Sequence, residues 1–206
     1  DGTTLDVADV VSLASEKSHG VTEELEEHGE EGHEHEHESG LDPHVWLDPA
    51  NMVAITKAVA SLLEKADPTH AEAYRTNASA LETKLSALDE AFKTGLEQCE
   101  RSDFVTSHAA FGYLAARYGL TQVPIAGIDP SNEPSGAQLA DITDLVKKDK
   151  ITTVFTEELV SPKVAETVAR ATGAKTATLD PIEGSTDGRS YLQIMQRNLD
   201  ALKKAN

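Results

Sequence analysis

The stretch Phe104–Gly119, FVTSHAAFGYLAARYG, contains a strand, a loop and a helix in succession. Its first residues, Phe104–Thr106, predict a short buried strand, and residues 109–118 predict a helix closed by a glycine suited to the left-handed position after a helix. Polar Ser107 and His108 lie between the two. The same reasoning predicts strands over 122–125, 152–156 and 175–179, and helices over 137–148, 162–171 and 190–204. This alternation predicts an α/β fold, with a parallel sheet flanked by helices on both faces.

Two helices are predicted before this lobe. Apolar residues at three- and four-residue spacing predict one helix over 49–66. A second, over 67–98, begins with Asp67 as N-cap and Pro68 as first helical residue, and it meets no helix breaker before Gly95. A helix of about 30 residues is about 45 Å long. We expect it to be a linking helix between two lobes, with one side of a helical bundle as the alternative.

Residues 1–66 are expected to be the remainder of an N-terminal lobe, and residues 99–206 the C-terminal α/β lobe. Leu5–Ala14 predicts a strand end followed by a helical turn. Residues 19–40 are dominated by Glu, His and Gly and have little to bury, so we expect a solvated loop. Four imidazoles in this loop are candidate low-affinity metal ligands: His28, His33, His35 and His37. An acidic loop with incidental histidines is the alternative.

Composition excludes several classes of function. The chain has 206 residues, 39% of them hydrophobic, and a formal net charge of −18, which disfavours nucleic-acid binding because phosphate recognition requires clustered Lys and Arg. The single cysteine, Cys99, excludes an internal disulfide and a Cys-type zinc site. No apolar run is long enough to span a bilayer, and no signal peptide begins the chain. Because the sequence opens in what reads as mid-domain, we expect a removed leader or a missing segment.

Polar residues follow three of the predicted strands, where ligands bind in open parallel sheets. Ser107 and His108 follow the first strand, Glu157 the third, and Asp180 the fourth. A further histidine, His44, lies between two Asp-Pro pairs that hold its segment extended. Taken alone, each strand-end residue is explained better by a capping or surface role, and His44 equally well by a surface loop, but their joint placement favours one site.

His44, His108 and Asp180 form a mixed nitrogen and oxygen donor set, which suits zinc better than magnesium or calcium. Only neutral imidazole binds a metal, so affinity is expected to fall below about pH 6.5. Glu157 is a candidate for orienting one of these ligands from outside the first coordination sphere. A helix-capping neighbour is the equal alternative for Glu157.

Several separated segments resemble the metal-specific, cluster A-I family of extracytoplasmic solute-binding proteins, the receptors of zinc or manganese ABC importers. The similarity covers nearly the whole chain and rests on residues 42–49, 107–114, 133–135, 155–157, 178–181 and 191–198. It implies two α/β lobes joined by one long rigid helix, with the metal between the lobes. It also implies a monomer outside the cytoplasmic membrane, periplasmic or lipid-anchored, that delivers its ion to a membrane permease.

The resemblance assigns His44 to the first lobe and His108 and Asp180 to the second. Manganese members tend to have Glu at the position of His108, so histidine there favours Zn²⁺ over Mn²⁺. A further family histidine near the start of the first lobe has no counterpart before His19, so one ligand is expected to be missing. We expect no catalysis, and no His-Glu-x-x-His motif is present. The alternatives are a metal-buffering or adhesion protein on the same fold and a zinc-dependent hydrolase.

Overall fold

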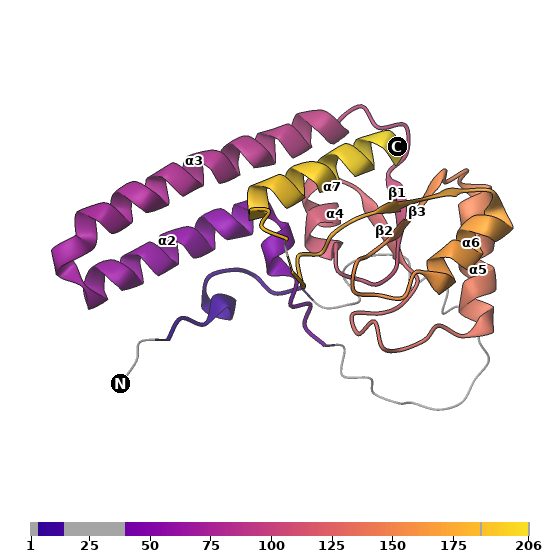
Figure 1. The fold of residues 1–206 in the computed structure, drawn as a ribbon, viewed down its shortest axis with the longest axis horizontal. Helices are drawn as coiled ribbons and strands as arrows, with labels where there is room; N and C mark the ends of the chain where they lie inside the picture. The colour runs from indigo at the N-terminus through magenta and orange to yellow at the C-terminus, as the bar shows by residue number, and fades with distance from the viewer. Residues whose placement is uncertain (1–3, 15–39, 186, 206) are drawn as a thin grey trace.

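The computed structural model describes residues 4–14, 40–185 and 187–205 (Figure 1). Its sheet consists of β1 (Asp103–Thr106), β2 (Thr121–Pro124), β3 (Thr153–Thr156) and β4 (Lys175–Thr178). The four strands are parallel and have the order β2-β1-β3-β4. The predicted α/β class with a parallel sheet is confirmed.

The helices of the lobe cover the two faces of this sheet. They are α4 (Gly112–Tyr118), α5 (Gly136–Lys148), α6 (Lys163–Thr172) and α7 (Tyr191–Ala205). Alternation along the strands decides which face each side chain joins. Phe104 and Phe155 point into a cluster with α3, α4 and α7, whereas Val105 and Val154 point into a cluster with α5 and α6. β1, β2 and β3 are therefore buried on both faces, whereas the edge strand β4 is largely exposed.

Helix ends follow the sequence signals closely. Gly119 and Gly173 follow α4 and α6 with φ values of +68° and +78°, the left-handed conformation that glycine adopts without steric cost. Ser135 and Gln138 form a reciprocal capping box at the start of α5. The helix predicted from residue 109 begins only at Gly112, because residues 109–111 form the loop that leaves the sheet.

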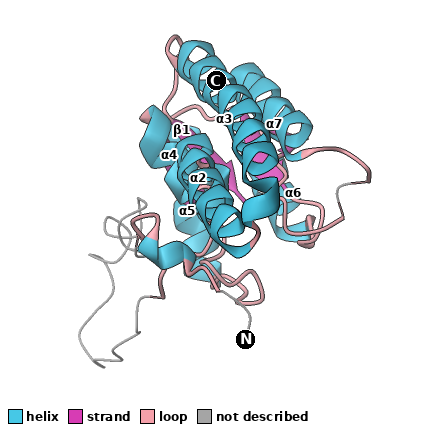
Figure 2. Cartoon of the chain, turned by 90° about the vertical axis from the view of Figure 1, so that its left-hand side faces the viewer, coloured by secondary structure: helices cyan, strands magenta, loops and turns pink. Residues whose placement is uncertain are grey.

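Helices α2 (Pro49–Ala66) and α3 (Ala71–Leu96) lie side by side and project from the lobe. Figure 2 views the molecule from the end of this hairpin, with the strands behind it. The predicted helix 67–98 is shorter than expected, because Pro68–His70 forms a separate 3-10 turn. Leu85, Leu88, Phe92 and Leu96 bury the second half of α3 in the lobe. The division into 1–66, 67–98 and 99–206, with a linking helix, stays a prediction.

The N-terminal residues pack beside the hairpin. Val7–Asp9 is a 3-10 turn, and the strand end expected within Leu5–Ala14 is not formed among residues 4–14. Val11 packs with Val45 and Tyr113 in a small cluster. Within the described residues, no helix is both long and apolar enough to cross a membrane.

Candidate metal centre

The sheet order brings two strand ends together. From β1 the chain adds β2 on one side, and from β3 it adds β4 on the other, so the order of strand addition reverses between β1 and β3. Ligands bind at such switch points in open α/β sheets. His108 follows β1 and Glu157 follows β3, so adjacent strands carry them to the same crevice. Both side chains are buried, His108 completely and Glu157 to 5% exposure.

Glu157 holds His108 in a fixed orientation. One of its carboxylate oxygens accepts the backbone N–H of His108 at 3.1 Å, and the other pairs with Nδ1 of the same residue. An Nδ1–H donated to a carboxylate leaves Nε2 with its lone pair free, the arrangement found behind metal-binding histidines. The structure thus gives Glu157 the orienting contact considered for it.

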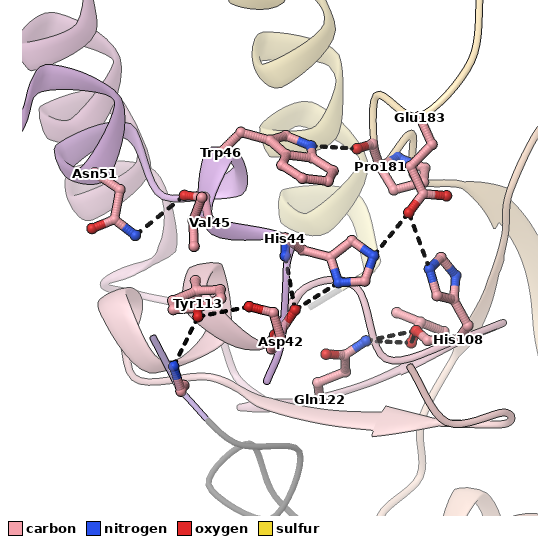
Figure 3. A network of polar contacts seen from close by, with 12 residues as sticks. Asp42, His44, Val45, Trp46, Asn51, His108, Tyr113, Gln122, Pro181 and Glu183 are labelled. Carbon is pink, nitrogen blue, oxygen red and sulfur yellow. Dashed lines mark hydrogen bonds and ion pairs between the residues drawn. The ribbon is translucent and has the colours of Figure 1, made fainter. Parts of the chain in front are cut away.

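His44 repeats this arrangement from the other side of the site. Asp42 Oδ1 accepts the backbone N–H of His44 at 2.9 Å and lies 2.6 Å from its Nδ1. The hydroxyl of Tyr113 donates to the carbonyl oxygen of Asp42 at 2.9 Å, which ties this segment to α4 (Figure 3). Asp42 and His44 are 0% and 3% exposed. The histidine side of the site is therefore built of two buried carboxylate–imidazole pairs.

Both imidazoles face a third side chain, Glu183. Its Oε1 lies 2.8 Å from Nε2 of His44 and 3.5 Å from Nε2 of His108 (Figure 3). The two rings are 5.3 Å apart between centroids. Nε2 of buried His108 has no hydrogen-bond partner within the described part of the chain. One donor atom from each of His44, His108 and Glu183 lies within 4.8 Å of the others.

These distances suit a small divalent cation. Zinc binds imidazole nitrogen at about 2.0 Å and carboxylate oxygen at about 2.1 Å, which at tetrahedral angles separates the donors by about 3.4 Å. The 3.5 Å between Glu183 and His108 is close to that value, whereas the 2.8 Å between Glu183 and His44 is a hydrogen-bond distance that would have to lengthen. Small side-chain movements would admit the ion.

Protonation competes with metal at this site. Burial lowers the pKa of His108, but the hydrogen bond to Glu157 and the charges of Glu157 and Glu183 raise it more, so the net pKa lies above the ordinary value. In the metal-free protein, His108 therefore keeps its proton to a higher pH than an ordinary histidine, and a bound cation must displace it.

The predicted candidates are placed differently from one another. His44 and His108 come together. Asp180 is not part of this cluster: it lines a small pocket with Glu183, and its Oδ1 accepts the backbone N–H of Ile182 at 2.8 Å. The candidate loop ligands His28, His33, His35 and His37 lie outside the described residues.

Two residues of the site were not identified from the sequence. Asp42 is two residues before His44, a spacing that lets one carboxylate oxygen reach both the backbone N–H and Nδ1 of that histidine. Glu183 is three residues after Asp180, beyond a turn whose conformation the sequence does not reveal. For Glu183, the available signal was an acidic residue shortly after the end of β4.

A known protein family matches nearly the whole chain. The family model described as "Zinc-uptake complex component A periplasmic", ZnuA, matches residues 2–205. The chain belongs to this family. Its ZnuA-family relatives include the zinc-binding lipoprotein AdcA of Streptococcus pneumoniae, 44% identical over 183 residues, which are 86% of this chain and 36% of that protein.

A second relative is the high-affinity zinc uptake system protein ZnuA of Bacillus subtilis, 44% identical over 188 residues, covering 84% of this chain and 59% of that protein. Among solved structures, a Zn(II)-bound AdcAII variant of Streptococcus pneumoniae matches with a TM-score of 0.80 and 35% identity, covering 98% of this chain and 69% of that one. The chain thus spans about a third to three-fifths of the curated relatives it matches. The predicted family is confirmed.

Proposed function

We propose that this chain is the zinc-capturing part of an extracytoplasmic receptor that delivers Zn²⁺ to an ABC importer. The observation that carries the proposal is the pair of buried histidines, each held at Nδ1 by a carboxylate and each presenting Nε2 to Glu183. Membership of the ZnuA family and the zinc-binding names of its relatives support the same function.

The donor set favours zinc over manganese. Two imidazole nitrogens and one carboxylate oxygen are typical of zinc, whereas manganese is better suited by carboxylate, carbonyl and water oxygens. His108 supplies nitrogen where the resemblance associates manganese binders with Glu. The cation is the cargo of this site, so the protein must hold it tightly and still release it.

We assign His44, His108 and Glu183 as metal ligands, and Asp42 and Glu157 as the residues that orient the histidines. Asp180, the carboxylate expected from the sequence, is the alternative third ligand, since it lines the same pocket as Glu183. Its bond to the backbone of Ile182 favours Glu183 in that role. The four loop histidines remain candidates for low-affinity binding.

Transport receptors need a membrane partner. We propose a monomer that meets an ABC permease, either as a periplasmic protein or as a lipoprotein at the outer face of the cytoplasmic membrane. The family description as periplasmic and the lipoprotein relative support this location.

We propose a carrier site rather than a catalytic one. A zinc hydrolase needs a free general base beside a metal-bound water. Both oxygens of Glu157 bond to His108, and Asp42 Oδ1 bonds to His44, so these carboxylates are committed to orienting ligands. Turnover of esterase or phosphatase substrates by zinc-loaded protein, lost on His44→Ala, would support the hydrolase alternative.

A competitive zinc titration tests the proposed function. The purified protein and a His44→Ala/His108→Ala variant are titrated against a chelator strong enough to outcompete the loop histidines. We expect one tight site in the first and none in the second. His70→Ala is the matched control, because His70 is 66% exposed at the turn between α2 and α3 and should leave binding unchanged. Tight binding retained by the double variant would refute the proposal.

A further inference from the structure

The turn that carries Glu183 has a strained backbone. Ile182, the residue just before the glutamate, has a φ of +60°. A β-branched side chain rarely adopts this left-handed conformation, since its Cβ crowds the backbone. Such strain persists only where surrounding contacts fix the conformation, and it is often found at functional sites. The contacts that fix this turn are therefore of interest.

One set of contacts fixes the start of the turn. The buried amide of Asn198, on α7, accepts the N–H of Asp180 at 2.9 Å and donates to the carbonyl of Asp180 at 2.8 Å. The carboxylate of Asp180 then accepts the N–H of Ile182. The backbone N–H and carbonyl of Asp180 are thereby both bonded to Asn198, and its carboxylate closes the turn through the N–H of Ile182.

A second set comes from the segment that carries His44. The indole Nε1–H of Trp46 donates to the carbonyl of Pro181 at 2.8 Å, and the carbonyl of Trp46 accepts the hydroxyl of Tyr191 at 2.8 Å. Figure 3 shows the indole reaching across to Pro181, with Glu183 next to it facing the imidazoles. The ring of Trp46 also meets His44 edge-on, at 5.4 Å between centroids. One residue thus touches both sides of the metal site.

We propose that Trp46 is a positioning residue that holds the strained turn in place, so that Glu183 faces His44 and His108. This inference rests on the proposed zinc function and deepens it. Pro181 is two residues from Glu183, so the hydrogen bond from the indole acts directly on the turn. Without that bond, the turn is free to relax toward an ordinary backbone conformation, which turns the carboxylate away from the imidazoles. The side chain of Glu183 is 27% exposed, so solvent can receive it.

Trp46→Phe tests this role, because it keeps an aromatic ring beside His44 and removes the N–H donor together with the five-membered ring that carries it. Zinc dissociation into excess chelator is followed by stopped flow for the wild type, Trp46→Phe, Glu183→Gln and the double variant. We expect Trp46→Phe to speed dissociation about 10-fold, as is typical when an outer contact of a metal site is lost. In the Glu183→Gln background, the same change should have no further effect, since Trp46 acts through Glu183.

Equal acceleration in both backgrounds would overturn the assignment, because Trp46 would then act on His44 or on folding. If Trp46→Phe does not fold, Tyr191→Phe takes its place in the same cycle, since it removes the bond to the carbonyl of Trp46 and keeps the indole. Tyr118→Phe, which loses a hydroxyl bond to Asp89 instead, is the control and should leave dissociation unchanged. A wild type without tight zinc binding would refute the proposed function itself, whereas tight binding with additive effects refutes only the role of Trp46.

Discussion

The two sides of the candidate metal site are built differently. His44 and His108 are 3% and 0% exposed, and each is bonded to a buried carboxylate. Glu183 faces them from a strained turn, with its side chain 27% exposed. Side chains locked by neighbours present donors without further loss of freedom, whereas an exposed side chain on a turn exchanges readily with water. We infer that the histidine side sets affinity and the glutamate side sets access.

Removing a histidine should have the largest effect on zinc binding. His108→Ala takes away a buried nitrogen donor that water cannot replace well in an enclosed site. Structural zinc sites gain about 10–16 kcal/mol from about four ligands, so one ligand is worth about 3 kcal/mol, or about 100-fold in affinity. Competition with a chelator measures this loss. An effect smaller than that of Glu183→Gln would reverse the comparison.

Replacing the glutamate should have an intermediate effect. Glu183→Gln keeps the shape and removes the charge, for which we expect a loss of about 2 kcal/mol, or about 30-fold. Asp180→Asn is the matched variant, one acidic residue earlier on the same turn, and it should cost less because its oxygen still accepts the N–H of Ile182. Isothermal titration of both variants ranks the two carboxylates. The opposite ranking would make Asp180 the ligand.

Neutralising the carboxylate behind His44 should have a smaller effect still. Asp42→Asn preserves an oxygen for Nδ1 but removes the negative charge that makes the imidazole a better donor. Changes of this kind typically reduce metal affinity about 10-fold. Zinc titration at constant pH measures the effect. An unchanged affinity would mean that the pairing of Asp42 with His44 serves folding alone.

A charged cluster away from both sides of the site should affect stability without affecting zinc. Arg117 on α4 makes two hydrogen bonds to Asp89 on α3, at 3.1 and 3.0 Å, and Tyr118 donates to the same carboxylate. Burial raises the pKa of Asp89, but these bonds lower it more, so its net pKa is below the ordinary value. Asp89→Asn should therefore cost about 1 kcal/mol at pH 7, after allowance for solvent screening.

The pH dependence of that cost follows from the sign of the shift. A carboxyl group with a lowered folded-state pKa stabilises the fold above its unfolded pKa of about 3.9 and loses this contribution as pH falls through the folded value. The stability difference between wild type and Asp89→Asn should thus be constant near neutrality and shrink below about pH 4. Denaturant unfolding at several pH values measures it. A gap that persists at low pH would indicate lost packing instead of lost charge.

Local sequence signals predicted most of the fold. Periodicity located the strands and helices of the lobe, and Gly119 and Gly173 marked two helix ends that the structure confirms. The same signals overextended the long helix, because Asp67-Pro68 begins a 3-10 turn as readily as an α-helix. The strand end expected near the N-terminus also failed, since a short apolar segment becomes a strand only where another strand can pair with it.

The site was predictable only in part, for a physical reason. His44 and His108 lie in segments with recognisable neighbours, so residue type and context were sufficient to select them. The proposed role of Glu183 involves the left-handed conformation of Ile182, which the residue type isoleucine does not predict. The turn is hydrogen-bonded to Trp46 and Asn198, distant residues that only the folded chain brings to it.

The most direct test of the zinc site is a crystal structure of the protein grown with one equivalent of zinc, with anomalous scattering recorded at the zinc edge. The assignment predicts one strong peak at about 2.0–2.2 Å from Nε2 of His44, Nε2 of His108 and a carboxylate oxygen of Glu183. A peak bonded to Asp180 in place of Glu183, or one that avoids either histidine, would contradict it.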